Sequence, residues 1–170
     1  MVSAIREHSA DKKQFSAEYQ VTKQIDGGKG SIKVSVGKWP RGWNGVVFNE
    51  RWTECVLKQQ TKKADAAVIA ANGVLRVAAV ELKTNIENYD YVEQLEASLN
   101  AVHKFLKTLR DLGEPIPNPD IRVAVIYEGS VKLKTKQLQS HRDIKWKSKK
   151  VRIEFRKRKA GFTLARWMCE

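Results

Sequence analysis

Apolar and polar residues alternate over two short segments near the N-terminus. Residues 19–25 and 31–36 flank the turn sequence DGGKG. Alternation with a period of two is typical of strands, so these segments predict a β-hairpin. Residues 1–18 are polar and charged, and we expect a short helix or a loosely ordered arm there. A loop is expected over residues 37–45, because proline and glycines interrupt any periodicity.

The pattern over residues 46–60 fits two kinds of element. Phe48, Trp52 and Cys55 fall at helical spacing. The sequence ECVLKQQT would equally place Cys55 and Leu57 on one face of a strand. We predict a helix first and a strand second within this segment.

Residues 64–83, ADAAVIAANGVLRVAAVELK, are almost entirely apolar and predict two strands joined at Asn72-Gly73. A helix is predicted over residues 91–112, with Asp90 and Glu93 resembling a capping box at its start and Gly113 as its stop. Its apolar positions form one stripe, made of Val92, Leu95, Leu99, Val102, Leu106 and Leu109.

The rest of the chain adds further strands. Residues 121–127, IRVAVIY, are apolar and β-branched and predict a buried strand. Lysines dominate residues 131–150, residues 151–155 alternate as a strand, and the tail predicts a short strand or a helical turn. The order of elements predicts an α/β (α+β) fold with a mixed central β-sheet flanked by helices.

A chain of 170 residues is long enough for one domain with a substantial core. We therefore expect a single domain over residues 1–170. Within it we distinguish an N-terminal arm and hairpin (1–45), a core (46–127) and basic C-terminal strands (128–170).

The turn at Asn72-Gly73 can close in two ways, and the choice sets the register of the whole hairpin. A two-residue type I′ turn would pair Ala71 with Val74. A three-residue loop with Gly73 as a left-handed bulge residue would pair Ala70 with Val74. Because a one-residue shift moves every side chain of a strand to the other face, the two turns differ in which charged residues lie together.

Asp65, Glu81 and Lys83 are the charges that depend on this register. With the two-residue turn, Asp65 lies on one face and the other two on the opposite face. With the glycine bulge, Asp65 faces Ala79 and is the diagonal neighbour of Glu81, roughly 7 Å away, while Arg76 falls on the opposite face. We expect the second arrangement, which brings two carboxylates and an ammonium group to one end of the sheet.

Such a cluster predicts a metal site. Two close carboxylates resist joint ionisation unless a cation lies between them. Mg²⁺ (or Mn²⁺) prefers oxygen ligands and takes one or two carboxylates, keeping water and substrate phosphate in its other positions. Lys83 would lie beside the attacking water and the scissile phosphate and stabilise developing charge. The alternative is that Asp65 only opens a strand, and that Glu81 and Lys83 form a strand-end pair in solvent.

Asp65, fifteen further residues and then Glu81-Leu82-Lys83 form a pattern that resembles the PD-(D/E)XK nuclease superfamily, which has the restriction-endonuclease-like fold. The resemblance implies cleavage of DNA, or occasionally RNA. It also implies that Asp65, Glu81 and the backbone carbonyl of Leu82 bind the metal ion. Lys83 would be the catalytic base or the charge stabiliser.

The resemblance covers residues 50–127 and suggests further site residues. Gln94, in the first turns of the helix that follows, is similar to an accessory glutamine of some subfamilies. Some members carry a glutamate on the first core helix, for which Glu50 and Glu54 are both candidates; the alternative is that either is a solvated helix acid. Ala64 replaces the proline of the pattern.

The net charge of +13 is concentrated near the C-terminus, where residues 130–170 hold fourteen Lys and Arg against three acids. Such asymmetry predicts a polyanionic partner, because each Lys or Arg laid on a phosphate releases counterions. Nucleic acid is the leading partner, with a solubilising surface or a lipid headgroup layer as alternatives. The expected contacts are Lys38, Arg41, Lys132, Lys134, Lys136, Arg142, Lys145, Lys147, Lys149 and Lys150.

Two groups of these residues have a second interpretation. Trp39 and Trp43, near Lys38 and Arg41, could stack on bases or could cap the core. The lysines at 132, 134 and 136 recur at every second residue. On a strand they would form a one-sided basic rail for a phosphate backbone, or a device that protects a sheet edge from aggregation.

Other chemistry finds little support in the sequence. Cys55 and Cys169 are far apart and lack CxxC spacing, which argues against a zinc site or a disulfide scaffold. The three histidines, His8, His103 and His141, have no common spacing that would indicate a histidine-metal nuclease. No stretch reaches the roughly 18 apolar residues that a membrane span needs, and we expect no membrane association.

The sequence thus predicts a metal-dependent nuclease that hydrolyses phosphodiester bonds in double-stranded or branched DNA, of the restriction, junction-resolving or repair type. It would act in the cytoplasm at the nucleoid, as a homodimer or with a partner subunit. One alternative is a noncatalytic nucleic-acid-binding module that keeps the nuclease fold. A second alternative is a basic structural or ribonucleoprotein component.

Overall fold

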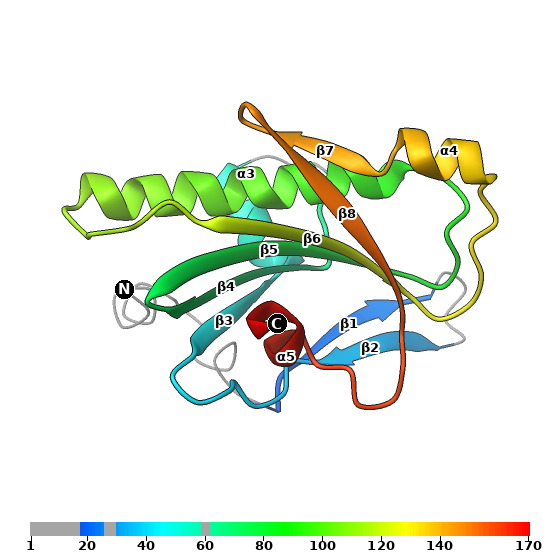
Figure 1. Ribbon diagram of the computed structural model, residues 1–170, viewed down its shortest axis with the longest axis horizontal. Helices are drawn as coiled ribbons and strands as arrows, with labels where there is room; N and C mark the ends of the chain where they lie inside the picture. The colour runs from blue at the N-terminus through cyan, green and yellow to red at the C-terminus, as the bar shows by residue number, and fades with distance from the viewer. Residues whose placement is uncertain (1–17, 26–29, 59–61) are drawn as a thin grey trace.

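The computed structural model describes residues 18–25, 30–58 and 62–170 (Figure 1). The arm predicted over residues 1–18, apart from residue 18, and most of the DGGKG turn lie outside the described residues. Four helices are described, α2 (Glu50–Leu57), α3 (Asp90–Asp111), α4 (Thr135–Ser140) and α5 (Leu164–Cys169). The described strands are β1 (Gln20–Gln24), β2 (Ser31–Ser35), β3 (Asn44–Asn49), β4 (Ala66–Asn72), β5 (Val74–Lys83), β6 (Asp120–Tyr127), β7 (Asp143–Trp146) and β8 (Lys149–Lys157).

Six of the strands form one mixed sheet in the order β3-β4-β5-β6-β8-β7. Strands β3, β4 and β5 are antiparallel neighbours, β5, β6 and β8 run parallel, and β7 returns antiparallel to β8. The long helix α3 provides the crossover between the parallel strands β5 and β6, as parallel pairing requires. The predicted α/β fold with a mixed central sheet flanked by helices is confirmed.

The two faces of the sheet are covered by different elements (Figure 1). Helices α2 and α3 pack on one face, and one cluster of buried side chains joins the sheet to the apolar stripe of α3. The β1–β2 hairpin and α5 pack on the other face, around Trp167 and Met168. Arg76 also lies on this second face, as predicted, and donates a hydrogen bond to the carbonyl of Met168.

The predicted β1–β2 hairpin is confirmed, and it is attached to α5. The two strands are antiparallel, and the backbone N–H of Ala165 donates to Val36 O at 2.9 Å. Gly37 permits this contact, because a β-carbon at position 37 would lie 2.6 Å from the Thr163 side chain. The hairpin is thereby held over the sheet at a fixed position.

The order predicted for residues 46–60 is wrong: the strand comes first and the helix second. Val46, Val47 and Phe48 are fully buried in β3, which pairs with β4 along its whole length. Asn49 then ends the strand and begins α2, since its side chain accepts a hydrogen bond from Trp52 N at 3.1 Å. Phe48 in β3 stacks on Trp52 in α2. The helical spacing of these two aromatic residues therefore reflects a contact across the junction between strand and helix, and not a single helix.

Helix α3 confirms the predicted apolar stripe but not the predicted capping box. Tyr89 is the N-cap residue and makes no capping hydrogen bond through its side chain. Asp90 lies inside the helix, and its carboxylate contacts Lys83 instead of the helix backbone. The helix ends at Asp111, with Gly113 in the left-handed conformation (φ 88°).

The basic C-terminal segment belongs to the main sheet. Strand β8 contains the predicted strand at 151–155 and pairs with the buried strand β6. Residues 135–140 form helix α4, so Lys132, Lys134 and Lys136 do not share one face of a strand. The prediction that these three lysines form a basic rail along a strand is wrong, because Lys134 is the N-cap residue of α4 and Lys136 lies within this helix. The tail forms the helical turn α5.

Candidate active site

Neither register considered for the β4–β5 hairpin is the observed one. Asn72 pairs with Val74 and Ala66 with Val80, so Gly73 alone occupies the turn, with φ at 67°. The left-handed conformation predicted for Gly73 is confirmed. The observed register differs from the bulge register by two residues, which preserves the faces of the side chains. Asp65, just before β4, therefore lies across from Glu81 and not diagonal to it.

Ala64 fixes the start of β4 against α3. Its backbone N–H donates to Gln94 O at 3.1 Å and to Ser98 Oγ at 3.0 Å. Proline has no N–H and could not make either bond. The departure from the superfamily pattern at this position thus has a structural role, since it holds Asp65 next to the helix that carries Gln94.

The two carboxylates predicted as metal ligands converge on one cation, the ammonium group of Lys23. Lys23 Nζ lies 3.2 Å from Asp65 Oδ2 and also contacts Glu81 Oε1. Asp65 Oδ2 additionally accepts a hydrogen bond of 2.7 Å from the backbone N–H of Leu82. The side chain of Leu82 is buried in the core on the hairpin side of the sheet.

Lys83 lies on the same side as Glu81 and extends toward α3. Its Nζ is 3.2 Å from Glu81 Oε1, 3.5 Å from Asp90 Oδ2 and 3.3 Å from Gln94 Oε1. The structure therefore brings together all four residues predicted to be catalytic, Asp65, Glu81, Lys83 and Gln94.

Burial controls the electrostatics of this cluster. The Glu81 side chain is fully buried, and desolvation, reinforced by the Asp65 carboxylate, raises the pKa of Glu81 to about 8 against the opposing effect of Lys23 and Lys83. Burial alone would lower the pKa of Lys23, but the carboxylates of Glu81 and Asp65 outweigh it and raise that pKa. Burial and Asp65 thus oppose ionisation of Glu81, and the ammonium groups of Lys23 and Lys83 favour it.

Two site residues were not predicted from the sequence. Lys23 comes from β1, some forty residues before Asp65, and its strand carries other polar residues that gave no reason to select it. Asp90 was predicted as a helix cap, although an acid one helical turn before Gln94 could have been placed on the same side of the helix.

Glu50 and Glu54 make their ion pairs with a different lysine, Lys63. Both carboxylates contact Lys63, with Glu50 Oε1 at 3.7 Å from Lys63 Nζ. Lys63 is almost entirely buried, whereas both glutamates are exposed. Their contacts with Lys63 explain why a helix at the surface carries two acids at this spacing.

The oxygen atoms of the cluster suit a divalent cation of the Mg²⁺ type. Glu81 Oε2 is buried, and no described residue donates a hydrogen bond to it. Such an oxygen is available as a ligand, and Mg²⁺ is commonly held by only one or two carboxylates. No group of three or more His, Cys, Asp or Glu side chains with metal-binding geometry occurs among the described residues. Asp65 and Glu81 are the carboxylates of the cluster that would hold the cation.

A cleft of about 280 Å³ adjoins the cluster. It is lined by Lys23 and Lys83 and, from the loop after β5, by Asn85 and Asn88. That loop is joined to the C-terminal segment, because Asn85 Oδ1 accepts a hydrogen bond from Ser130 N at 2.9 Å. Glu87 and Asp90 line the cleft as well, where Asp90 pairs with Lys83 and Glu87 with Lys132. A phosphate group entering the cleft would meet two ammonium groups, two amides and these two paired carboxylates.

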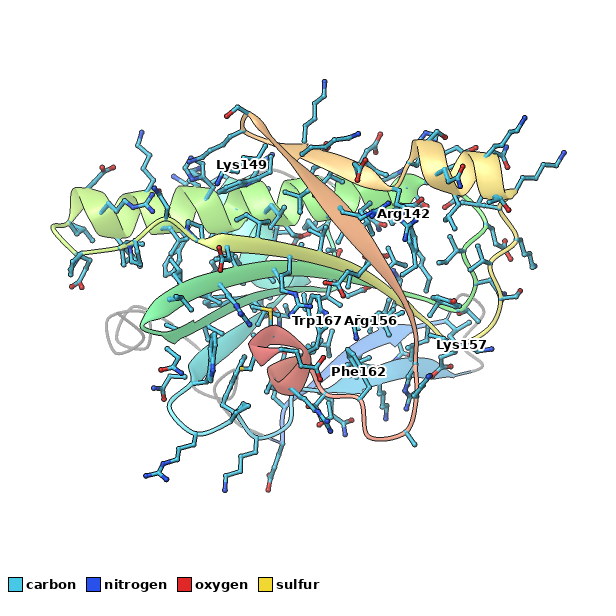
Figure 2. All side chains as sticks on the ribbon, in the orientation of Figure 1. Arg142, Lys149, Arg156, Lys157, Phe162 and Trp167 are labelled. Carbon is cyan, nitrogen blue, oxygen red and sulfur yellow. The ribbon has the colours of Figure 1, made fainter. Side chains whose placement is uncertain are left out.

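The predicted nucleic-acid contacts are exposed but fall into separate groups. Lys145, Lys147, Lys149 and Lys150 belong to the β7–β8 hairpin, and Figure 2 shows Lys149 at its turn beside α3 and Arg142 at its start. Helix α4 and the segment before it carry Lys132, Lys134 and Lys136, with Lys132 paired to Glu87 at 2.6 Å. Lys38 and Arg41 lie in the loop before β3.

Trp39 and Trp43 pack against the core beside this loop. Both are partly buried against the core cluster on the hairpin side of the sheet. A β-carbon at Gly45 would overlap the Trp39 ring, and the Arg76 guanidinium lies 5.0 Å from the centroid of Trp43. These contacts favour the core-capping interpretation over base stacking.

No family model, curated protein or solved structure matches this chain. The resemblance to the PD-(D/E)XK superfamily therefore stays a prediction carried by the site residues themselves. Within the described part of the chain, no helix has both the length and the apolarity that crossing a membrane requires.

Proposed function

We propose that this protein is a metal-dependent nuclease that hydrolyses phosphodiester bonds. The observation that supports the proposal is the convergence of Asp65 and Glu81 at one end of the sheet, with Lys83 in contact with Glu81. Paired carboxylates beside a lysine supply what phosphodiester hydrolysis needs, namely metal ligands and a group that stabilises charge.

Each residue has a distinct role in this proposal. Asp65 and Glu81 hold a divalent cation (Mg²⁺ or Mn²⁺), and the Leu82 carbonyl is a further candidate ligand. When bound, such a cation would lower the pKa of a coordinated water and stabilise charge on the scissile phosphate. Lys83 orients the water or stabilises the phosphate, and Gln94 positions Lys83 through its contact with the ammonium group.

DNA, double-stranded or branched, is the proposed substrate. The exposed lysines of the β7–β8 hairpin support a polyanionic partner, because charge against phosphates dominates nucleic-acid affinity. Each chain offers a single Asp65-Glu81-Lys83 cluster, so cleavage of both strands would require a homodimer or a partner subunit.

A cleavage assay tests the proposal. The protein is incubated with supercoiled, linear, branched and single-stranded DNA and with RNA, in the presence of Mg²⁺ or Mn²⁺. We expect cleavage that is lost in EDTA and in the Asp65→Ala and Lys83→Ala variants, and kept in Glu54→Gln, which removes an acid paired with Lys63. Cleavage that persists in the Asp65 and Lys83 variants would place the active site elsewhere.

A noncatalytic nucleic-acid-binding module is the second candidate, and Lys23 is the observation that favours it. The ammonium of Lys23 joins both carboxylates, as it would in a purely structural ion-pair cluster. This candidate predicts binding that falls steeply with salt, no cleavage, and no effect of Asp65→Ala on affinity.

A further inference from the structure

Lys23 lies at the centre of the candidate site although its strand is not part of the main sheet. Strand β1 pairs only with β2 among the described strands. Its Lys23 reaches over the end of the sheet, and the ammonium group contacts Asp65 and Glu81 at the position that a cation joining them would take. The side chain is about 29% exposed and lines the cleft, so it can turn outward without unfolding the core.

The local charges show why Lys23 and a divalent cation exclude each other. The carboxylates of Asp65 and Glu81 contact the ammonium groups of Lys23 and Lys83, and Lys83 also contacts Asp90. A divalent cation bound to the same oxygens would lie next to the Lys23 ammonium, and like charges at contact distance in a buried site repel strongly. One of the two has to leave the carboxylates.

We propose that Lys23 is an internal competitor for the divalent cation: it neutralises Asp65 and Glu81 until a metal ion displaces it. The inference rests on the proposed metal-dependent function. The displaced ammonium group turns into the cleft, which is lined by Lys83, by the amides of Asn85 and Asn88 and by the carboxylates of Glu87 and Asp90. There it can pair with these carboxylates or with a nucleic-acid phosphate. Metal affinity is thus set by Lys23, a residue outside the sheet that carries the ligands.

Direct metal binding tests this assignment without reference to cleavage. Mn²⁺ alone is titrated into the full chain, and free Mn²⁺ is measured by electron paramagnetic resonance. We expect Lys23→Met to bind Mn²⁺ at least tenfold more tightly than the natural sequence, because a neighbouring opposite charge changes a carboxylate's affinity for a cation by about one to three powers of ten. Lys33→Met, which removes an exposed lysine from the same hairpin, is expected to bind as the natural sequence does.

A thermal melt provides the second readout and shows that the variant is folded. Without Mn²⁺, Lys23→Met removes one of the two ammonium groups that contact Asp65 and Glu81, leaving Lys83, and is expected to melt at a lower temperature. Mn²⁺ is expected to raise the melting temperature of Lys23→Met more than that of the natural sequence, since a ligand stabilises in proportion to its affinity.

The outcomes separate this inference from the proposed function. Equal Mn²⁺ affinity in the natural sequence and Lys23→Met, lost in Glu81→Gln, would overturn the competitor role and leave the metal site standing. Weaker binding in Lys23→Met would also overturn it, because Lys23 would then assist the metal. Absence of Mn²⁺ binding in both proteins would remove the metal site itself, and the nuclease proposal with it.

Discussion

The ammonium group of Lys83 lies 3.3 Å from Gln94 Oε1, so a side chain at the end of β5 is held by the first turns of α3. If Lys83 acts on the phosphate, Gln94 acts through it as a positioning residue. We expect Lys83→Ala to lower the cleavage rate by about 100-fold or more, and Gln94→Ala by roughly tenfold. Single-turnover cleavage measures both.

The double variant tests whether the two residues act as one unit. Residues that work through each other show non-additive effects, so Lys83→Ala combined with Gln94→Ala should be no slower than Lys83→Ala alone. Asn100→Ala, an exposed position on the same helix, serves as the control and should cleave normally. If the rate loss in the double variant equals the product of the two single rate losses, Gln94 has a role independent of Lys83.

The turn at Gly73 gives a prediction about stability. Gly73 has φ at 67°, and a β-carbon there would have no atom within 4 Å, so the cost of a side chain is conformational and not steric. Gly73→Ala is expected to lower the free energy of unfolding by about 1–2 kcal/mol. Gly73→Asn should cost less, because asparagine tolerates the left-handed region. Urea denaturation compares the two, and equal losses would contradict the conformational explanation.

The sequence determined the faces of the hairpin more reliably than its register. Asp65 and Glu81 are on one side in the observed register and in the predicted bulge register, because the two differ by an even number of residues. The exact pairing of β4 with β5 depends on the number of residues in the turn at Gly73. The alternation of residues along a strand does not specify that number. The stripe of α3 and the strand β6 were predictable for a related reason, since long periodic or apolar segments permit few alternatives.

Two features depended on tertiary contacts that the local sequence does not contain. Val46, Val47 and Phe48 form a strand because β4 offers a pairing edge, although Phe48 is also at helical spacing from Trp52. Lys23 enters the site because its hairpin is held over the sheet through α5. The sequence around a single lysine in an amphipathic strand does not indicate that this lysine contacts the site.

Glu154 gives the stability a defined dependence on pH. Its carboxylate accepts hydrogen bonds from Arg122 at 3.0 Å, Arg156 at 2.8 Å and Trp167 Nε1 at 3.1 Å. Burial alone would raise the pKa of Glu154, but these bonds outweigh it and lower that pKa. A lowered pKa in the folded state stabilises the protein above the unfolded value of about 4.3, and this contribution is lost as the pH falls through the folded pKa.

Glu154→Gln should therefore reduce the free energy of unfolding by on the order of 1 kcal/mol at pH 7, after allowance for partial solvent screening. The difference from the natural sequence should shrink as urea denaturation is repeated at successively lower pH below the unfolded value of about 4.3, because the carboxylate becomes protonated as the pH falls through its lowered folded pKa. Glu128→Gln removes a single surface pair with Arg158 and should change stability by less than about 0.5 kcal/mol. A Glu154→Gln difference independent of pH would mean that packing, not charge, stabilises this position.

The β7–β8 hairpin is expected to bind the phosphate backbone of the nucleic acid. Its exposed Lys147 and Lys149 lie next to His103 and Arg110 of α3 around a pocket of about 140 Å³. Lys147→Gln and Lys149→Gln should each weaken binding and reduce the slope of log affinity against log salt by about 0.9. Fluorescence anisotropy with a DNA duplex measures the slope, and Lys33→Gln on the opposite side of the sheet is the matched control. Equal slopes in all variants would mean that these lysines only solubilise the protein.

His103 reports on the same contact by an independent route. Burial and the positive charges of Lys147, Arg110 and Lys107 lower the pKa of His103. A phosphate bound at the hairpin adds negative charge beside these groups, which favours the protonated imidazole, so the pKa of His103 should rise when DNA binds. An NMR titration of the histidine ring resonances, with and without a DNA duplex, measures the change. In Lys147→Gln the free protein should start from a higher His103 pKa, because one of the repelling charges is gone, and DNA should raise it less. A His103 pKa that DNA leaves unchanged would place the bound phosphates elsewhere on the molecule.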